Sequence, residues 1–231
     1  ISRETVIGGE PFKGENARGG RSVAGSILKE SGRGSLVLLP KRFWVPGVHT
    51  PKMLITVEDC QLELVQGDIT RQEVDVIVNA ANSDLAGGGG VDGAIHRAAG
   101  PSLFEETSRE FPDGCPTGSA VPTSAGDLPA QFVFHAVGPI WRGGGDGEED
   151  LLRGCYRRCL ELALEKGLES VAFPAISTGV YGYPVDLAAE TALDEVRRFL
   201  ESSARPSLVR FVLFSDGHFG AHARVLEEMV G

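Results

Sequence analysis

The sequence is poor in the features that mark secreted or membrane proteins. Only four cysteines occur among 231 residues, and none belongs to a CxxC pair. So few cysteines in a chain of this length exclude a disulfide-dense scaffold and favour a reducing compartment. No apolar run approaches the roughly 18 residues that span a bilayer, and the first residues lack the basic-then-apolar pattern of a signal peptide. We therefore expect a cytoplasmic protein without a membrane partner.

Several catalytic and cofactor motifs are also missing or incomplete. No G-x-S-x-G nucleophile elbow occurs, which argues against a serine hydrolase. Gly88, Gly90 and Gly93 satisfy G-x-G-x-x-G, but nine residues separate them from the preceding strand pattern, and no strand ending in an acidic residue follows about 20 residues on. His218 and His222 have the spacing of a metal pair without a third ligand nearby. We expect neither a nicotinamide cofactor nor a metal.

Charge divides the chain into two parts. Residues 1–52 carry nine Lys and Arg against four Asp and Glu, whereas the remainder carries 13 against 28. So acidic a body disfavours nucleic-acid partners, because binding to the phosphate backbone requires clustered basic residues. The first 52 residues are rich in glycine without a sustained hydrophobic period, and we expect a flexible leader. The alternative is that translation begins at Met53, the first methionine, and that the leader is not native. Residues 53–231 form the expected domain.

Hydrophobic patterning in this domain predicts an α/β fold. Strands alternating with helices indicate a largely parallel sheet covered on both faces. In such sheets ligands bind beyond the carboxyl ends of the strands. The expected strands are 61–65, 74–78, 131–137, 170–175 and 208–214, and the expected helices are 91–99, 151–166, 187–200 and 221–229.

The most informative segment is 74–101, which reads as a buried strand, a polar loop, four consecutive glycines and a helix. Glycines let the backbone approach a ligand closely, and the N-terminus of the following helix favours an anion. A second small, glycine-containing loop follows the strand at 170–175. Two such loops predict a diphosphate held between them.

For each of five polar or aromatic residues near these loops, the sequence allows either a structural role or a role in binding or catalysis. Asp92 is either an N-terminal helix charge or a group that orients water beside a phosphate. Asn82 either shapes its own turn or binds sugar hydroxyls, and His96, on the same helix face as Asp92, is structural or catalytic. Asp68 is a turn residue or an acceptor for an exocyclic amine, while Phe214 is core or stacks on a base.

These segments together resemble a macrodomain, the ADP-ribose-binding α/β/α module, and in particular its hydrolytic branch. The resemblance covers about residues 60–230. Its motifs are GDIT at 67–70, NAAN at 79–82, GGGGVDGAIHRAAGP at 87–101, GCPTG at 114–118 and ISTGVYGYP at 176–184.

The resemblance implies a three-layer fold with a central, mostly parallel mixed sheet, and an ester hydrolase acting on ADP-ribose derivatives. The substrates would be O-acetyl-ADP-ribose or proteins mono-ADP-ribosylated on acidic side chains. The alternative is an ADP-ribose reader without activity. The implied catalytic residues are Asn82, Asp92 and His96, and the implied ligand-binding residues are Asp68, Ile69, Gly88, Gly89, Gly90, Val91, Ser177, Thr178, Gly179, Val180, Tyr181 and Phe214. No cofactor beyond the ligand and a water is implied.

Overall fold

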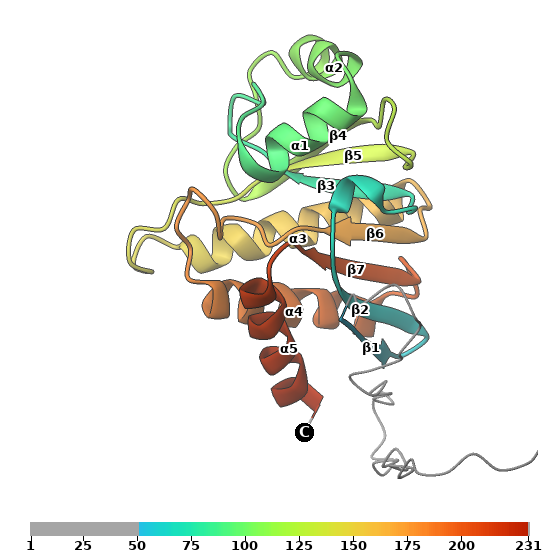
Figure 1. Cartoon of the computed structure of the whole chain (residues 1–231), viewed down its shortest axis with the longest axis vertical. Coiled ribbons are helices and arrows are strands. Elements are labelled where there is room, and N and C mark those ends of the chain that lie inside the picture. Colours follow the sequence, from blue (N-terminus) through green and yellow to red (C-terminus); the bar gives the residue numbers. More distant parts are fainter. Residues whose placement is uncertain (1–50, 231) are drawn as a thin grey trace, which may run out of the picture.

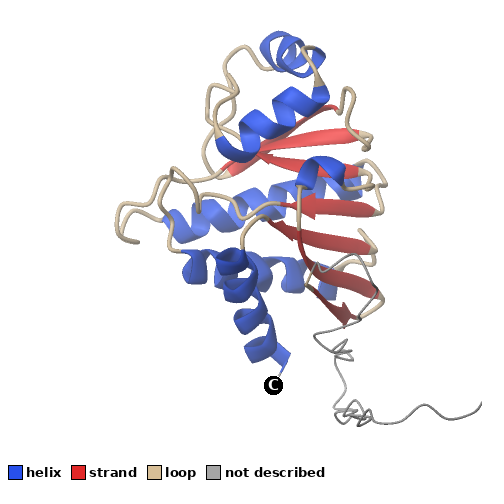
Figure 2. Cartoon of the chain, in the orientation of Figure 1, coloured by secondary structure: helices blue, strands red, loops and turns tan. Residues whose placement is uncertain are grey.

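A computed structural model describes residues 51–230, and strands and helices alternate along most of this range (Figure 2). The strands are β1 (Lys52–Val57), β2 (Cys60–Gln66), β3 (Val76–Ala80), β4 (Ser119–Ser124), β5 (Phe132–Val137), β6 (Ser170–Phe173) and β7 (Leu208–Leu213). The helices are α1 (Gly90–Ala99), α2 (Ser102–Glu110), α3 (Glu148–Glu165), α4 (Val185–Ser202) and α5 (Asp216–Val230), and a short 3₁₀ turn, η1 (Ile69–Arg71), follows β2.

The predicted leader, residues 1–52, lies outside the described residues except for its last two. β1 begins at Lys52, one residue before the expected domain start at Met53. Between residues 51 and 230, no helix combines the length and the apolar character needed to cross a membrane.

The seven strands form one sheet in the order β1-β2-β7-β6-β3-β5-β4. The five inner strands run parallel, and β1 and β4 pair antiparallel at the two edges. This arrangement confirms the predicted mixed, mostly parallel sheet. Because parallel strands all end at the same edge, the loops that follow β2, β7, β6, β3 and β5 gather there, toward the left of Figure 1.

Side chains along each inner strand alternate between two cores. Val76, Val78 and Phe134 pack in the core that α3, α4 and α5 cover. Ile77 and Val133, which point to the opposite face, pack with α1 and α2. Helices therefore cover both faces, and the predicted three-layer α/β/α fold is confirmed.

Besides the edge strand β1 and the short turn η1, β4 and α2 have no counterpart among the sequence predictions. β4 contains Pro122, which lacks the N–H that a central strand needs and is tolerated because β4 is an edge strand. α2 buries only Leu103 and Thr107, so its apolar period is too short to stand out.

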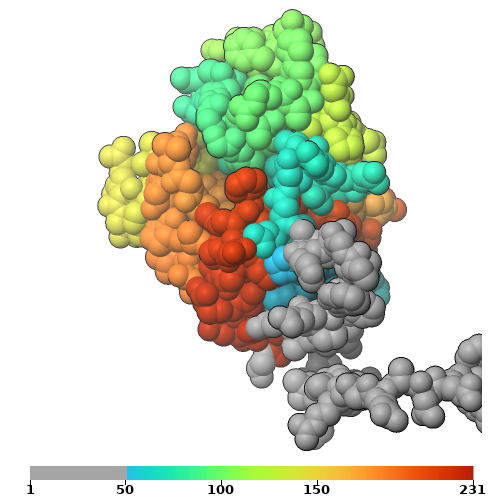
Figure 3. All heavy atoms as spheres, viewed as in Figure 1, coloured from blue at the N-terminus to red at the C-terminus, as the bar shows by residue number. Residues whose placement is uncertain are grey.

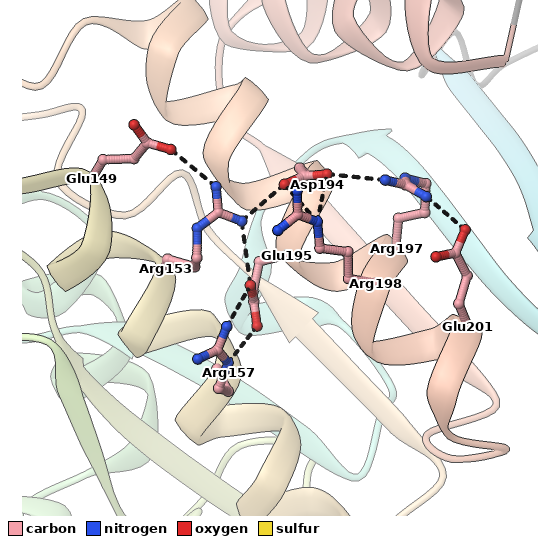
Figure 4. Close-up of polar contacts among 8 residues, drawn as sticks. All are labelled: Glu149, Arg153, Arg157, Asp194, Glu195, Arg197, Arg198 and Glu201. Carbon is pink, nitrogen blue, oxygen red and sulfur yellow. Dashed lines mark hydrogen bonds and ion pairs between the residues drawn. The ribbon is translucent and has the colours of Figure 1, made fainter.

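An ion-pair network joins α3 to α4 (Figure 4). Glu195 is buried and accepts hydrogen bonds from Nε of Arg157 at 2.7 Å and from Nη1 of Arg153 at 3.3 Å. Nη1 of Arg153 also lies 2.9 Å from Asp194, to which Arg197 and Arg198 bind from the same helix. The network holds the two helices together behind the loops of the carboxyl edge.

Candidate functional site

The sheet order places the expected ligand-binding residues in a row. Asp68 and Ile69 follow β2, Phe214 follows β7, the second loop follows β6, and the glycine loop follows β3. These strands are consecutive neighbours, so an elongated ligand lying across the carboxyl edge would meet all four loops in that order. On the face shown in Figure 3, the teal, green, orange and red segments that carry these loops meet at one place.

Asn82 shapes the loop between β3 and α1. Its Nδ2 donates to the carbonyl of Gly87 at 2.8 Å, and its Oδ1 accepts from the N–H of Ala86 at 3.2 Å. The structural reading of Asn82 is thus correct. One Nδ2 hydrogen remains unassigned by these contacts, so the predicted hydrogen bond to a ribose hydroxyl stays a prediction.

The glycine loop leaves the start of α1 open. Gly90 has φ of +58°, a left-handed conformation that favours glycine, and a Cβ on Gly89 or Gly90 would meet nothing within 4 Å. No side chain caps the helix, which begins at Gly90 rather than at the predicted Val91. Together with Gly88, these residues expose the helix N-terminus to a ligand, as an anion site requires.

Asp92 lies directly beneath this loop. It is 5% exposed, and a Cβ built on Gly88 would lie 3.0 Å from its Oδ2. Its Oδ1 accepts a hydrogen bond from Nδ2 of Asn79 at 2.7 Å and lies 3.4 Å from Nε2 of His96. The ring of His96 packs below Gly87. The structure therefore brings Asp92 and His96 together as predicted, with the carboxylate against the backbone of the glycine loop.

The second loop, 177–181, is fastened at both ends. Ser177 is buried at φ of +66°, with no hydrogen-bond partner for its Oγ within the described chain. Oγ1 of Thr178 donates to the carbonyl of Ala175 at 2.8 Å and lies 3.0 Å from Nε2 of His218. The hydroxyl hydrogen of Thr178 is thus already used within the protein, and the implied binding of a ligand by Thr178 stays a prediction.

The tip of the same loop stands free in solvent. Gly179 accepts from the N–H of Gly182, closing a turn, and Val180 is 97% exposed. The carbonyl of Tyr181 accepts from the N–H of Trp141 at 2.9 Å, which ties the loop to the segment after β5. A free tip on a fixed base is suited to covering a bound ligand.

At the other end of the row, Asp68 caps η1. Its Oδ1 accepts from the N–H of Thr70 at 2.9 Å, while the carboxylate is exposed. Ile69 buries its side chain, which leaves its backbone as the part that can reach a ligand. Phe214 is 85% exposed at the end of β7. The core reading of Phe214 is wrong, and its ring is available for stacking.

Three polar residues behind Asp92 were not recognised from the sequence as parts of the site. Nδ2 of Asn79 donates a hydrogen bond to the carboxylate of Asp92. His135 and Thr123 continue this contact into the sheet. Burial, with His96 nearby, lowers the pKa of His135 to about 4, so its ring is neutral at neutral pH. A histidine within an apolar strand gives no sequence signal of such a role.

His218 and His222, which have the spacing of a metal pair, both make other contacts: the ring nitrogens of His218 lie beside Ser215 and Thr178. His222 is buried, and its Nδ1 lies 2.9 Å from the carbonyl of His218. Nowhere in residues 51–230 do three or more His, Cys, Asp or Glu side chains gather around a point that could hold a metal ion.

Comparisons with known proteins agree with this geometry. The family model described as Macro domain matches residues 78–192. The O-acetyl-ADP-ribose deacetylase of Escherichia coli is 52% identical over 170 residues, which make up 73% of this chain and 96% of that protein. A protein of the same name from Enterobacter cloacae is 54% identical over 170 residues, covering 73% of this chain and 94% of its own length.

Solved structures give the same result. The Oceanobacillus iheyensis macrodomain with ADP has a TM-score of 0.76 at 45% identity, covering 79% of this chain and 98% of that one. The Trypanosoma brucei macrodomain in complex with ADP-ribose has a TM-score of 0.66 at 44% identity, covering 74% of this chain and 69% of that one. By sequence, fold and the arrangement of its loops, the chain belongs to the macrodomain family.

Proposed function

We propose that this protein is an ester hydrolase that removes the acetyl group from O-acetyl-ADP-ribose. The observation that carries the proposal is the position of Asp92, a buried carboxylate held by Asn79 directly beneath an open glycine loop at a helix N-terminus. A site that only held a diphosphate would have no need of a fixed negative charge next to it. Relatives more than 50% identical carry the name O-acetyl-ADP-ribose deacetylase, which supports the same reaction.

The order of the loops along the sheet edge supports one orientation of the ligand. The adenine would sit at the β2–β7 end, with its amine toward Asp68 and its ring against Phe214. The diphosphate would lie between the glycine loop and the second loop, where backbone N–H groups and the end of α1 favour negative charge. The distal ribose would then reach the β3 end, close to Asn82 and Asp92.

The reaction follows from this placement. A water molecule held by the carboxylate of Asp92 adds to the carbonyl carbon of the acetyl ester. The bond between that carbon and the ribose oxygen breaks, the ribose oxygen takes up one proton of the attacking water, and ADP-ribose leaves together with acetate and the second proton. Loop N–H groups stabilise the negative charge that develops on the carbonyl oxygen. We assign Asp92 to orienting the water rather than to full proton abstraction.

The same chemistry extends to proteins carrying mono-ADP-ribose on Asp or Glu, because that linkage is also an ester at the distal ribose. The exposed tip at Gly179 and Val180 leaves room for a macromolecule on this side. We include such proteins as second substrates and partners. We further place the protein in the cytoplasm, since its four cysteines are free and buried, as in proteins of reducing compartments.

The competing function is that of a reader, which would bind ADP-ribose and catalyse nothing. Replacement of Asp92 separates the two. Asp92→Asn keeps an oxygen that can accept from Asn79 but removes the charge. We expect kcat to fall by about 100-fold or more, with little change in ADP-ribose affinity measured by calorimetry. Turnover by Asp92→Asn at the parental rate would remove Asp92 from the mechanism.

The diphosphate site has its own test. Gly89→Glu fits the backbone, because nothing lies within 4 Å of its Cβ, and it places a carboxylate in the proposed anion site. We expect calorimetry to detect no ADP-ribose binding. Gly145→Glu is the matched control, since Gly145 is equally open and lies in the loop after β5. Equal binding by both variants would contradict the placement of the diphosphate.

A further inference from the structure

A line of buried polar side chains runs through the sheet to Asp92. Asn79 on β3 lies beside His135 on β5, its partner in the strand register, and Thr123 follows on β4. The exposed fraction is 0% for Asn79 and His135 and 2% for Thr123. Nδ2 of Asn79 lies 3.2 Å from Nδ1 of His135, and Nε2 of His135 lies 2.9 Å from Oγ1 of Thr123. Polar groups this deeply buried are costly unless they are hydrogen-bonded, and each of these three side chains contacts the next.

The hydrogens of this line can be assigned from its acceptors. The carboxylate of Asp92 only accepts, so it must face the NH₂ of Asn79. The second amide hydrogen then points to Nδ1 of His135, which must be unprotonated. The remaining ring hydrogen is on Nε2 and is donated to Thr123, whose own hydroxyl hydrogen goes to the carbonyl of Ser124 at 3.0 Å. From Thr123 to Asp92, the donor and the acceptor of each hydrogen bond in the line are therefore determined.

These donor and acceptor roles determine the orientation of the Asn79 amide group. Turning the amide over would place its Oδ1 against two acceptors, Nδ1 of His135 and the carboxylate of Asp92. The observed orientation is kept although it leaves Oδ1 of Asn79 buried and without a partner among the described residues. An unpaired buried acceptor costs about 1–3 kcal/mol, so the two contacts of the NH₂ group outweigh that cost.

We propose that Thr123 and His135 are positioning residues for Asp92, which act through Asn79 by selecting the ring tautomer that holds the carboxylate in its working orientation. The inference rests on the proposed function, since it assigns to the line a part in ester hydrolysis. Thr123 and His135 touch neither the substrate nor the water in this account.

Thr123 offers a clean test because valine has nearly its shape. Thr123→Val removes the acceptor for Nε2–H, so the ring regains a hydrogen bond if its hydrogen moves to Nδ1 and the amide of Asn79 turns its Oδ1 toward it. The turned amide no longer presents its NH₂ to Asp92, and the carboxylate loses that hydrogen bond. Thr123→Ser keeps the hydroxyl and serves as the matched control. We expect kcat for O-acetyl-ADP-ribose to fall by about 10- to 100-fold in Thr123→Val, as for a displacement near 1 Å in an active site, and to stay near the parental value in Thr123→Ser.

Four measurements distinguish positioning from a loss of stability. ADP-ribose affinity should be unchanged in both variants, and turnover is measured at a temperature where circular dichroism shows both to be folded. Ring ¹⁵N NMR should report an Nε2–H tautomer for His135 in the parent and Thr123→Ser, and a changed signal in Thr123→Val. His135→Asn, whose amide oxygen can occupy the Nδ1 position, should retain more activity than His135→Gln, whose amide reaches only the Nε2 position.

The outcomes separate this inference from the function on which it rests. An active parent with equal kcat in Thr123→Val and Thr123→Ser would overturn the inference and leave the hydrolase intact. An unchanged ¹⁵N signature in Thr123→Val would overturn it as well. If the unmutated protein binds ADP-ribose but releases no acetate, that result would contradict both the proposed function and the positioning role.

Discussion

Two buried histidines should make the fold lose stability in mild acid. His135 on β5 and His222 on α5 are each almost fully inaccessible to solvent. Burial lowers the pKa of each from 6.5 to about 4; His96 adds to the shift of His135, whereas the hydrogen bond to the carbonyl of His218 opposes that of His222 without cancelling it. Between these two values the unfolded chain binds protons that the folded protein does not, so acidification favours unfolding. The stabilisation that comes from keeping these two histidines neutral is fully present above pH 6.5, and it is lost as the pH falls toward 4.

The size of the effect follows from the shift. Each pKa unit corresponds to about 1.4 kcal/mol, so a fall from 6.5 to about 4 makes each histidine worth ~3 kcal/mol. The two lie on separate elements and should add. A domain of this size has about 5–15 kcal/mol of total stability, so the pair decides whether the protein stays folded near pH 4.5.

Urea unfolding followed by circular dichroism at several pH values measures how steeply the free energy of unfolding falls with pH. Burial alone would raise the pKa of the carboxylates Glu63 and Asp75, but hydrogen bonds from their neighbours outweigh it and lower the pKa below the ordinary 4.5 and 3.8. Their stabilisation is therefore lost only at lower pH, and the range above pH 4.5 reports on the histidines. His222→Leu, which cannot titrate, should show about half the parental slope. A free energy of unfolding that is constant over this range, or an unchanged slope in His222→Leu, would refute the reasoning.

Three further predictions concern packing and binding. Glu195→Ala should lower the free energy of unfolding by about 1–3 kcal/mol in urea titrations, because two arginines lose a buried partner; no measurable loss would contradict the role of the network. Gly93→Ala should cost about 1–3 kcal/mol and weaken ADP-ribose binding in calorimetry, because its Cβ would collide with the carbonyl of Gly88; a variant with parental stability and affinity would show that the close approach is not needed. Phe214→Ala should keep the parental Tm and weaken ADP-ribose binding by about tenfold, as expected for one lost stacking contact. Phe104→Ala, on α2, is its matched control, and equal affinities would remove Phe214 from the adenine site.

Much of this fold could be predicted from hydrophobic patterns. The inner strands are short β-branched or apolar runs, and the long helices show a clear 3.6-residue period, so the parallel sheet and its two helical layers follow. β4 could not be predicted, because SAVPTS has only two β-branched residues and the proline between them argues against a strand. Its position depends on pairing with β5, a contact that only the folded chain makes.

Part of the candidate site could likewise be predicted from the sequence, and part could not. The glycine loop and Asp92 are visible in the sequence because their chemistry depends on neighbouring residues. The line through Thr123, His135 and Asn79 is not visible, because it depends on the register of three strands and on the face to which each side chain points. A histidine in FVFHAV has the same sequence pattern whether it fills space or orients a catalytic group.

The central claim is that this macrodomain hydrolyses an ADP-ribose ester. The most direct test is a mass-resolved turnover assay of the parent with O-acetyl-ADP-ribose, beside a protein mono-ADP-ribosylated on glutamate. We expect release of acetate from the first substrate and of free ADP-ribose from the second, and the two rates would rank the substrates. Tight ADP-ribose binding without release of either product would contradict the claim and identify the protein as a reader.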